Sequence, residues 1–138
     1  MTGTVDETYV AALQHDLVEP GEATLVGVVR RPTGWFRAAV DENVPVLGPP
    51  RDLLEEAKAR TEDLKRDGLC DEGAHNAARA ELDFERRYRD HLDADGAAAL
   101  DDIADRLRDG EDLWLVCFEG DGKRCHRRPL VELLRDRV

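Results

Sequence analysis

Two short runs of mostly apolar residues stand out from a chain whose other segments are rich in charge. They cover residues 24–29 (TLVGVV) and 113–118 (LWLVCF). An unbroken apolar run of this length is typical of a strand covered on both faces, as in a parallel sheet. The pattern therefore predicts two buried β-strands.

Apolar residues recur at intervals of three and four through the rest of the chain, and each such stripe predicts an amphipathic helix. One stripe follows a Pro-Pro pair, one covers residues 78–92, and one covers residues 100–107. A last helix is predicted from about Pro129 to Arg135, with the proline in the first turn, where its missing N–H costs nothing. The stripe residues are Leu53, Leu54, Ala57, Thr61 and Leu64, then Ala78, Leu82, Phe84, Tyr88, His91 and Leu92, then Leu100, Ile103, Ala104 and Leu107.

Three segments have weaker patterns. Residues 5–17 fit a helical stripe, and residues 7–13 within them fit a strand equally well. Residues 40–50 predict a loop with a short strand at 44–47, and residues 68–76 predict a solvated loop. Buried strands with helices between and after them predict an α/β fold, in one compact layered domain over residues 1–138 with a short, mainly parallel sheet flanked by helices.

The charge balance changes the list of partners to consider. The chain has 31 acidic and 20 basic residues, a formal charge of −11, and only three of the basic residues are lysines. A net negative field repels polyanions, which disfavours a protein that coats nucleic acid or an anionic membrane, but leaves a local basic site open. An acidic, lysine-poor surface is also what we expect in the cytosol of a halophile, where salt screens self-repulsion.

Targeting signals and a disulfide framework are not expected. No run approaches the ~18 apolar residues of a membrane span, and the N-terminus lacks the pattern of a signal peptide. We therefore expect a cytoplasmic protein with no membrane partner. Cys70, Cys117 and Cys125 make an odd number of cysteines, and in a reducing compartment they are expected to be free thiols.

The junction between the second strand and the last helix, residues 117–129, is the best candidate site, because ligands of open α/β sheets bind beyond the carboxyl ends of strands and next to helix N-termini. Three known sequence signatures of ligand-binding or catalytic sites do not match these residues. A P-loop would need Ser or Thr after Lys123, where Arg124 stands. A Cys-x5-Arg loop starting at Cys117 would need arginine where Lys123 stands. Cys117, Cys125 and His126 are too few for a structural zinc site, so no metal ligands are assigned.

The same residues resemble a known family. A strand ending in Cys117-Phe-Glu119, a short loop and Cys125-His126-Arg127 at the start of a helix closely resemble the C-terminal signature of the DUF488 family. Residues 26–32 (VGVVRRP) are similar to that family's strand ending in Val-Arg, and residues 84–92 are similar to its helix carrying Phe and Tyr. The family's opening strand is not evident in the first 15 residues. The resemblance implies a compact α/β fold and places the site, but it implies no reaction.

The chemistry of the cluster is open at this point. Cys125 beside a helix N-terminus and several cations meets the conditions that lower a thiol pKa. It could act as a nucleophile with His126 as base, form a redox pair with Cys117, or share a metal with nearby Cys and His. Glu119 could move a proton. Alternatively, Cys117 is a small core residue and His126 only bonds the helix end.

The leading hypothesis is a basic Cys/His/Arg pocket that binds a small anionic or phosphate-bearing ligand, with thiol- or metal-dependent catalysis as an option. The alternatives are a non-catalytic module that binds a ligand or a nucleic-acid phosphate, and a redox-responsive protein that uses Cys117 and Cys125. The residues do not decide whether the chain is an enzyme, which cofactor it would use, or its oligomeric state. The predicted catalytic residues are Cys125, His126, Cys117 and Glu119, and the predicted ligand-binding residues are Arg30, Arg127, Arg124 and Tyr88.

Overall fold

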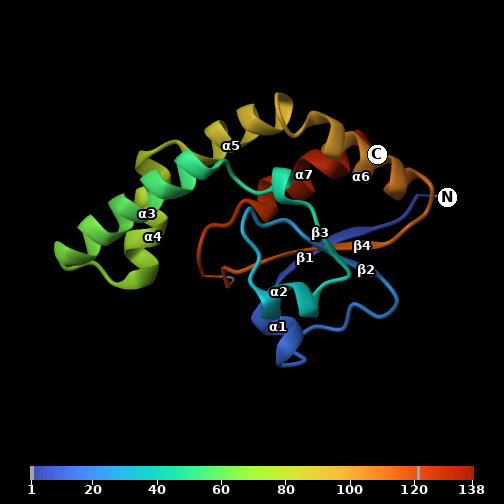
Figure 1. The fold of residues 1–138 in the computed structure, drawn as a ribbon, viewed down its shortest axis with the longest axis horizontal. Coiled ribbons are helices and arrows are strands. Elements are labelled where there is room, and N and C mark those ends of the chain that lie inside the picture. Colours follow the sequence, from blue (N-terminus) through green and yellow to red (C-terminus); the bar gives the residue numbers. More distant parts are fainter. Residues whose placement is uncertain (1, 121) are drawn as a thin grey trace.

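A computed structural model describes residues 2–120 and 122–138 and contains the predicted α/β fold. Its four-stranded sheet has the order β1-β4-β2-β3, and every pair is parallel. The strands are β1 (Val5–Tyr9), β2 (Thr24–Gly27), β3 (Glu42–Asn43) and β4 (Leu113–Cys117). The two predicted buried strands are β2 and β4, and they pair with each other (Figure 1).

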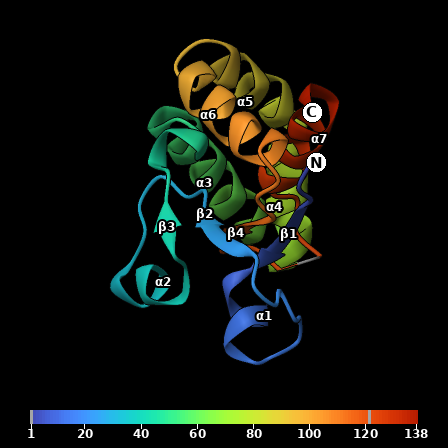
Figure 2. The ribbon, with the colours of Figure 1, turned by 90° about the vertical axis from the view of Figure 1, so that its right-hand side faces the viewer.

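Helices cover both faces of this sheet. Figure 2 shows α1 (Val10–Gln14) and α2 (Gly34–Ala39) below the strands, with α5 (Phe84–Asp93), α6 (Ala97–Arg108) and α7 (Arg127–Arg137) above them. The helices α3 (Arg51–Arg66) and α4 (Asp71–Glu81) pack against each other and extend to one side. None of the helices in the described ranges is long and apolar enough to cross a lipid bilayer.

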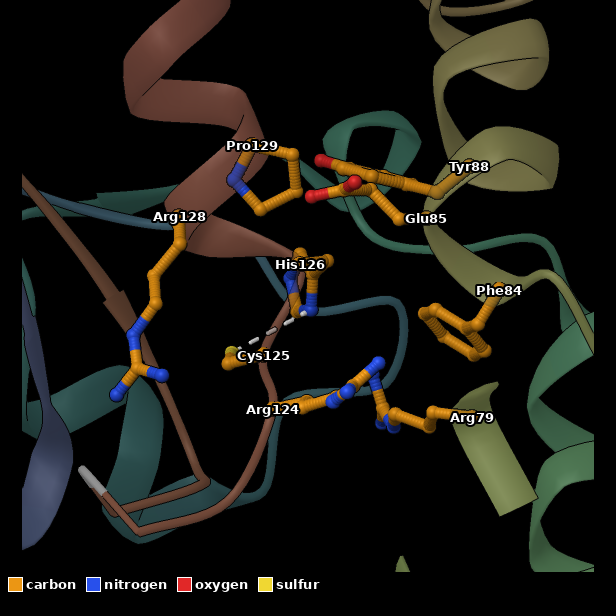
Figure 3. Close-up of a pocket in the computed structure, with 9 residues that line it drawn as sticks. All are labelled: Arg79, Phe84, Glu85, Tyr88, Arg124, Cys125, His126, Arg128 and Pro129. Atoms are coloured by element: carbon orange, nitrogen blue, oxygen red, sulfur yellow. Dashed lines mark hydrogen bonds between the residues drawn. The ribbon is translucent and has the colours of Figure 1, made fainter. Parts of the chain in front are cut away.

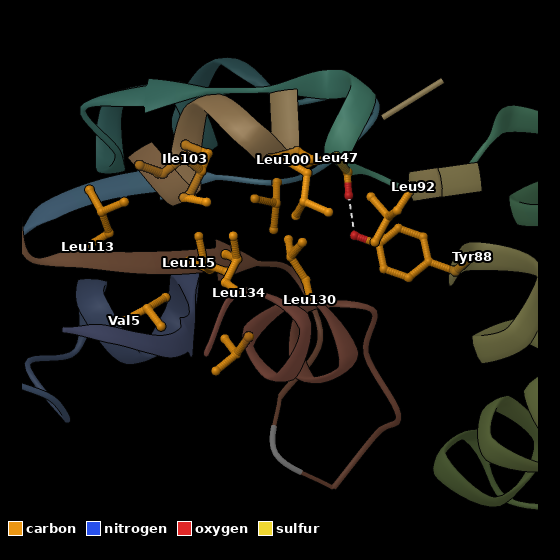
Figure 4. Close-up of a cluster of buried hydrophobic side chains, with 14 of the residues drawn as sticks. Val5, Leu47, Tyr88, Leu92, Leu100, Ile103, Leu113, Leu115, Leu130 and Leu134 are labelled. Carbon is orange, nitrogen blue, oxygen red and sulfur yellow. Dashed lines mark hydrogen bonds between the residues drawn. The ribbon is translucent and has the colours of Figure 1, made fainter. Parts of the chain in front are cut away.

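The alternation of side chains along the strands divides the core into two clusters. Leu113 and Leu115 of β4 belong to the larger cluster, which is shared with η1 (Pro45–Leu47), α3, α5, α6 and α7 (Figure 4). Val116, on the opposite face, belongs to a smaller cluster with Phe36 of α2. Cys117 and Cys125 also lie in the smaller cluster, so the end of β4 and the start of α7 are joined by packing.

Two expectations about local structure are wrong. The short strand lies at Glu42–Asn43, where it pairs with β2, and residues 45–47 instead form a 3-10 turn that starts at Pro45, whose ring cannot donate to a sheet. Residues 71–76 are not loop but the first turns of α4, because the Cys70 side chain accepts a hydrogen bond from the Gly73 N–H and caps the helix.

Two further stretches contain two elements where the pattern indicated one. Residues 5–17 hold a strand followed directly by a short helix, so both interpretations apply to part of the segment, and the strand is the opening strand that was not evident in the sequence. The stripe over residues 78–92 is divided between α4 and α5 at Asp83, whose φ of 52° lies in the left-handed region that aspartate tolerates.

Candidate functional site

The candidate site lies where β4 ends and α7 begins. Cys117 is the last residue of β4, and Cys125 and His126 directly precede the first helical residue of α7, Arg127. All four are 5% exposed or less. The fold therefore brings together the cysteines and the histidine that the sequence placed at this junction.

The Cys125 sulfur has two polar neighbours at the same distance. Its Sγ lies 3.7 Å from Glu119 Oε2. It also lies 3.7 Å from His126 Nδ1 (Figure 3). On the other side of the ring, His126 Nε2 lies 2.5 Å from the Val28 carbonyl oxygen. A carbonyl only accepts, so Nε2 carries a proton, and in the neutral form of the ring the lone pair is on Nδ1, which faces Cys125. His126 is thus oriented to take the Cys125 proton.

The two buried thiols titrate as a pair with opposite shifts. Burial raises the pKa of Cys117, and the neighbouring Cys125 raises it further, so Cys117 holds its proton. Burial also opposes a thiolate at Cys125, but the Cys117 S–H, His126 and Arg127 outweigh it and hold the pKa of Cys125 well below its usual value. Of the two thiols, Cys125 is therefore the one that ionises first.

Arg127 fixes the inner side of the cluster and is fully buried. Its Nη1 donates to Cys117 Sγ and, at 2.6 Å, to the Glu119 carbonyl oxygen, while its Nε lies 3.5 Å from Glu7 Oε1. These contacts join β1, β4 and α7. Arg127 acts on the thiols from within the core and does not line the pocket described next.

A pocket of about 230 Å³ opens on the outer side of Cys125. Its lining residues are Arg79, Phe84, Glu85, Tyr88, Arg124, Cys125, His126, Arg128 and Pro129 (Figure 3). One wall comes from the residues leading into α7 and the other from α4 and α5. Three arginines around one buried sulfur make this pocket suited to an anion.

The predicted ligand-binding residues separate in the structure. Arg124 lines the pocket and is exposed. Tyr88 also lines it, but its hydroxyl donates to the Leu47 carbonyl oxygen, so the pocket meets its ring. Arg30 lies outside the lining and donates to the carbonyl oxygens of Gly48 and Pro49, at 3.2 and 3.1 Å.

Sequence reasoning missed Arg79 of α4, which is only 6% exposed and lies in the same pocket. Its Nη2 lies 3.5 Å from Glu119 Oε1, and its guanidinium carbon lies 3.9 Å from the centroid of the Phe84 ring. Nothing in the sequence marks it, since it is one arginine among many on a segment partly interpreted as loop. A buried arginine is recognised only once the fold is known.

Among the described residues, one group of side chains has the composition of a metal site. Ligand atoms of Cys117, Glu119 and Cys125 lie within 4.8 Å of one another. However, the Arg127 guanidinium already donates to Cys117 and that of Arg79 pairs with Glu119. Two fixed cations beside the same ligand atoms disfavour a divalent ion and favour a thiolate.

Comparisons with known proteins give one match. No curated protein and no solved structure matches the chain. A family model, DUF488-N3a, described as "Active DUF488-N3 subclade", matches residues 8–138. That range includes the whole junction and nearly all of the sheet, which confirms the resemblance seen in the sequence: the chain belongs to the DUF488 family.

Proposed function

We propose that the protein is a thiol-dependent enzyme in which Cys125 attacks a small anionic substrate held in the arginine-lined pocket. The observation that carries the proposal is the alignment of Cys125 Sγ with His126 Nδ1 at 3.7 Å, in a ring oriented by the Val28 carbonyl. A nucleophile next to a base that a third group orients is the arrangement that activates a side chain for covalent catalysis.

In the proposed reaction, His126 Nδ1 takes the Cys125 proton and Sγ forms a bond to an electrophilic atom of the substrate. The leaving group departs with the electron pair of the broken bond and takes the proton back from His126. The Cys117 S–H and Arg127 stabilise the thiolate before attack. The N-terminus of α7 adds its positive dipole end at the same place.

The pocket supports an anionic substrate because cations surround the sulfur although the chain has a net charge of −11. Arg79, Arg124 and Arg128 come from two separate segments, 79 in α4 and 124–128 at the α7 junction. Their positive charge is therefore a local property of the pocket. A substrate with a negative group would be drawn to this place.

The rate of alkylation of Cys125 by iodoacetamide between pH 5 and 9 tests the proposal. A Cys70→Ser background removes the exposed thiol, and peptide mass spectrometry separates Cys125 from Cys117. We expect the midpoint of the Cys125 curve to lie below ~8.5, the value of a free thiol. A Cys125→Ser variant provides the blank. A midpoint at or above the free-thiol value would refute thiolate catalysis.

A second candidate function is binding without chemistry. It is supported by the buried N–H groups of Arg79, which would hold an anion whether or not Cys125 reacts. Cys125→Ser separates the two functions, because affinity for an anion such as phosphate survives in a binding module, whereas turnover of any substrate requires the sulfur. The orientation of His126 favours catalysis.

A further inference from the structure

We propose that Arg79 is the residue that binds the anionic group of the substrate, and that this group is a phosphate ester. The inference rests on the proposed function, because it places the charged end of that substrate beside Cys125. It assigns a role to a residue that the sequence does not single out, and it makes Arg79 the determinant of substrate class.

The burial of Arg79 is not matched by its hydrogen bonds. Its side chain is 7% exposed, yet within residues 2–120 and 122–138 no acceptor reaches Nε or Nη1. Burial lowers the pKa of this guanidinium and the charge of Glu119 offsets only part of that effect. A guanidinium keeps its proton in proteins, so these N–H groups are donors that need acceptors.

The partners that Arg79 does have leave two of its donor nitrogens unused. The Glu119 carboxylate lies at Nη2, and the Phe84 ring covers the guanidinium at 3.9 Å. Together they hold the group in position without using its remaining donors. The residue is therefore presented rigidly, with two donor nitrogens to spare, at the wall of a pocket. Such preorganisation is what an anion-binding residue requires.

A second cation approaches the same space. Figure 3 shows the Arg124 and Arg79 side chains extending toward each other from opposite walls of the pocket. Two guanidinium groups that converge repel each other unless an anion lies between them. Donors arriving from two directions fit a tetrahedral oxyanion better than a planar carboxylate, because phosphate offers acceptor oxygens on several sides.

The test uses inorganic phosphate as the probe and Cys125 as the reporter. Iodoacetate carries a negative charge and iodoacetamide does not, so the ratio of their alkylation rates, normalised to that of free N-acetylcysteine, reports a cation beside the sulfur. We compare the wild-type protein with Arg79→Gln. Arg66→Gln is the matched control, since Arg66 is exposed at the end of α3 and pairs with Asp63.

In the wild-type protein we expect the normalised alkylation rate with iodoacetate to exceed that with iodoacetamide by about tenfold. This ratio corresponds to the free energy of one charge-assisted hydrogen bond. Phosphate should slow both reagents, and acetate at the same ionic strength should not. Arg79→Gln should lose the preference and the protection while still reacting with iodoacetamide, and Arg66→Gln should behave as the wild type. Preference and protection retained in Arg79→Gln would overturn the proposal.

Two further outcomes keep this inference separate from the proposed function. If Cys125 reacts with neither reagent, thiol catalysis fails, and phosphate binding measured by calorimetry still decides the role of Arg79. Binding that disappears in Arg79→Gln supports the proposal, and equal binding refutes it. If the variant does not fold, equal protection by phosphate and acetate in the wild-type protein refutes the phosphate site, and protection by phosphate alone supports it.

Discussion

Replacement of Arg79 by methionine is expected to leave the protein as stable as the wild type or more stable, although it removes a buried side chain. Substitution of a buried residue usually destabilises the protein. Arg79 should differ because two of its nitrogens are buried without an acceptor among the described residues. Methionine keeps the unbranched stem that packs on Phe84 and carries no donors.

The magnitude follows from the contacts. Each unsatisfied buried donor costs about 1–3 kcal/mol, and the substitution removes two of them. Against this, the pair with Glu119 is long at 3.5 Å and its carboxylate is 24% exposed, so its loss costs about 1 kcal/mol. The cation–π contact with Phe84 is worth about 1 kcal/mol, and a sulfur–aromatic contact replaces part of it. The net change lies between zero and a gain of about 4 kcal/mol.

Urea unfolding of the two proteins, with and without phosphate at constant ionic strength, measures this change. Phosphate should raise the free energy of unfolding of the wild type, by about 2.7 kcal/mol at a hundred times its Kd, and leave the variant unaffected. Arg66→Met controls for the loss of one charge and should stay within about 0.5 kcal/mol. A loss above about 2 kcal/mol in Arg79→Met without phosphate would show that Arg79 is structural and refute the reasoning.

Three other substitutions test the site. Tyr88→Phe takes the donor from the buried Leu47 carbonyl, so the free energy of unfolding by urea should fall by about 1–3 kcal/mol while Cys125 alkylation is unchanged. Burial opposes a thiolate at Cys125 and His126 favours it, so His126→Gln should move the midpoint of the alkylation rate to higher pH, and an unmoved midpoint contradicts its role as base. Cys117→Ala removes the S–H donor and should shift the same curve in the same direction. In the wild-type protein a mild peroxide should yield a Cys117–Cys125 disulfide detectable by mass spectrometry, and its absence would remove the redox alternative.

The sequence was sufficient for the part of the site that is local in the chain. An apolar run predicts β4, a proline-led stripe predicts α7, and the residues between them must lie at the carboxyl edge of the sheet. The proximity of Cys117, Cys125 and His126 could therefore be predicted without the structure. The same argument could not predict the opposite wall of the pocket. That wall comes from α4 and α5, which are distant from the junction in the sequence and meet it only in the folded chain.

Local conformation also limited what the pattern could predict. The left-handed turn at Asp83 leaves the helical spacing of apolar residues nearly intact, so a single stripe continues across two helices. The capping of α4 by Cys70 is similarly hidden, since cysteine is not among the usual N-cap residues. Arg30 has the charge of an anion-binding residue, but its side chain donates hydrogen bonds to carbonyl groups of a nearby loop instead.

The electrostatics of the site affect both the proposed nucleophile and the proposed substrate. A thiolate and an anionic substrate repel each other, and the acidic chain around them increases that repulsion. Arg127 offsets the charge of the thiol pair from the core side, where it contacts Cys117. Arg79 interacts with the charge of Cys125 from the pocket side, where it also has donors for a ligand. One buried cation can therefore stabilise the thiolate before the substrate arrives and reduce its repulsion of the substrate afterwards, which explains why a protein with so many carboxylates would leave this guanidinium incompletely paired.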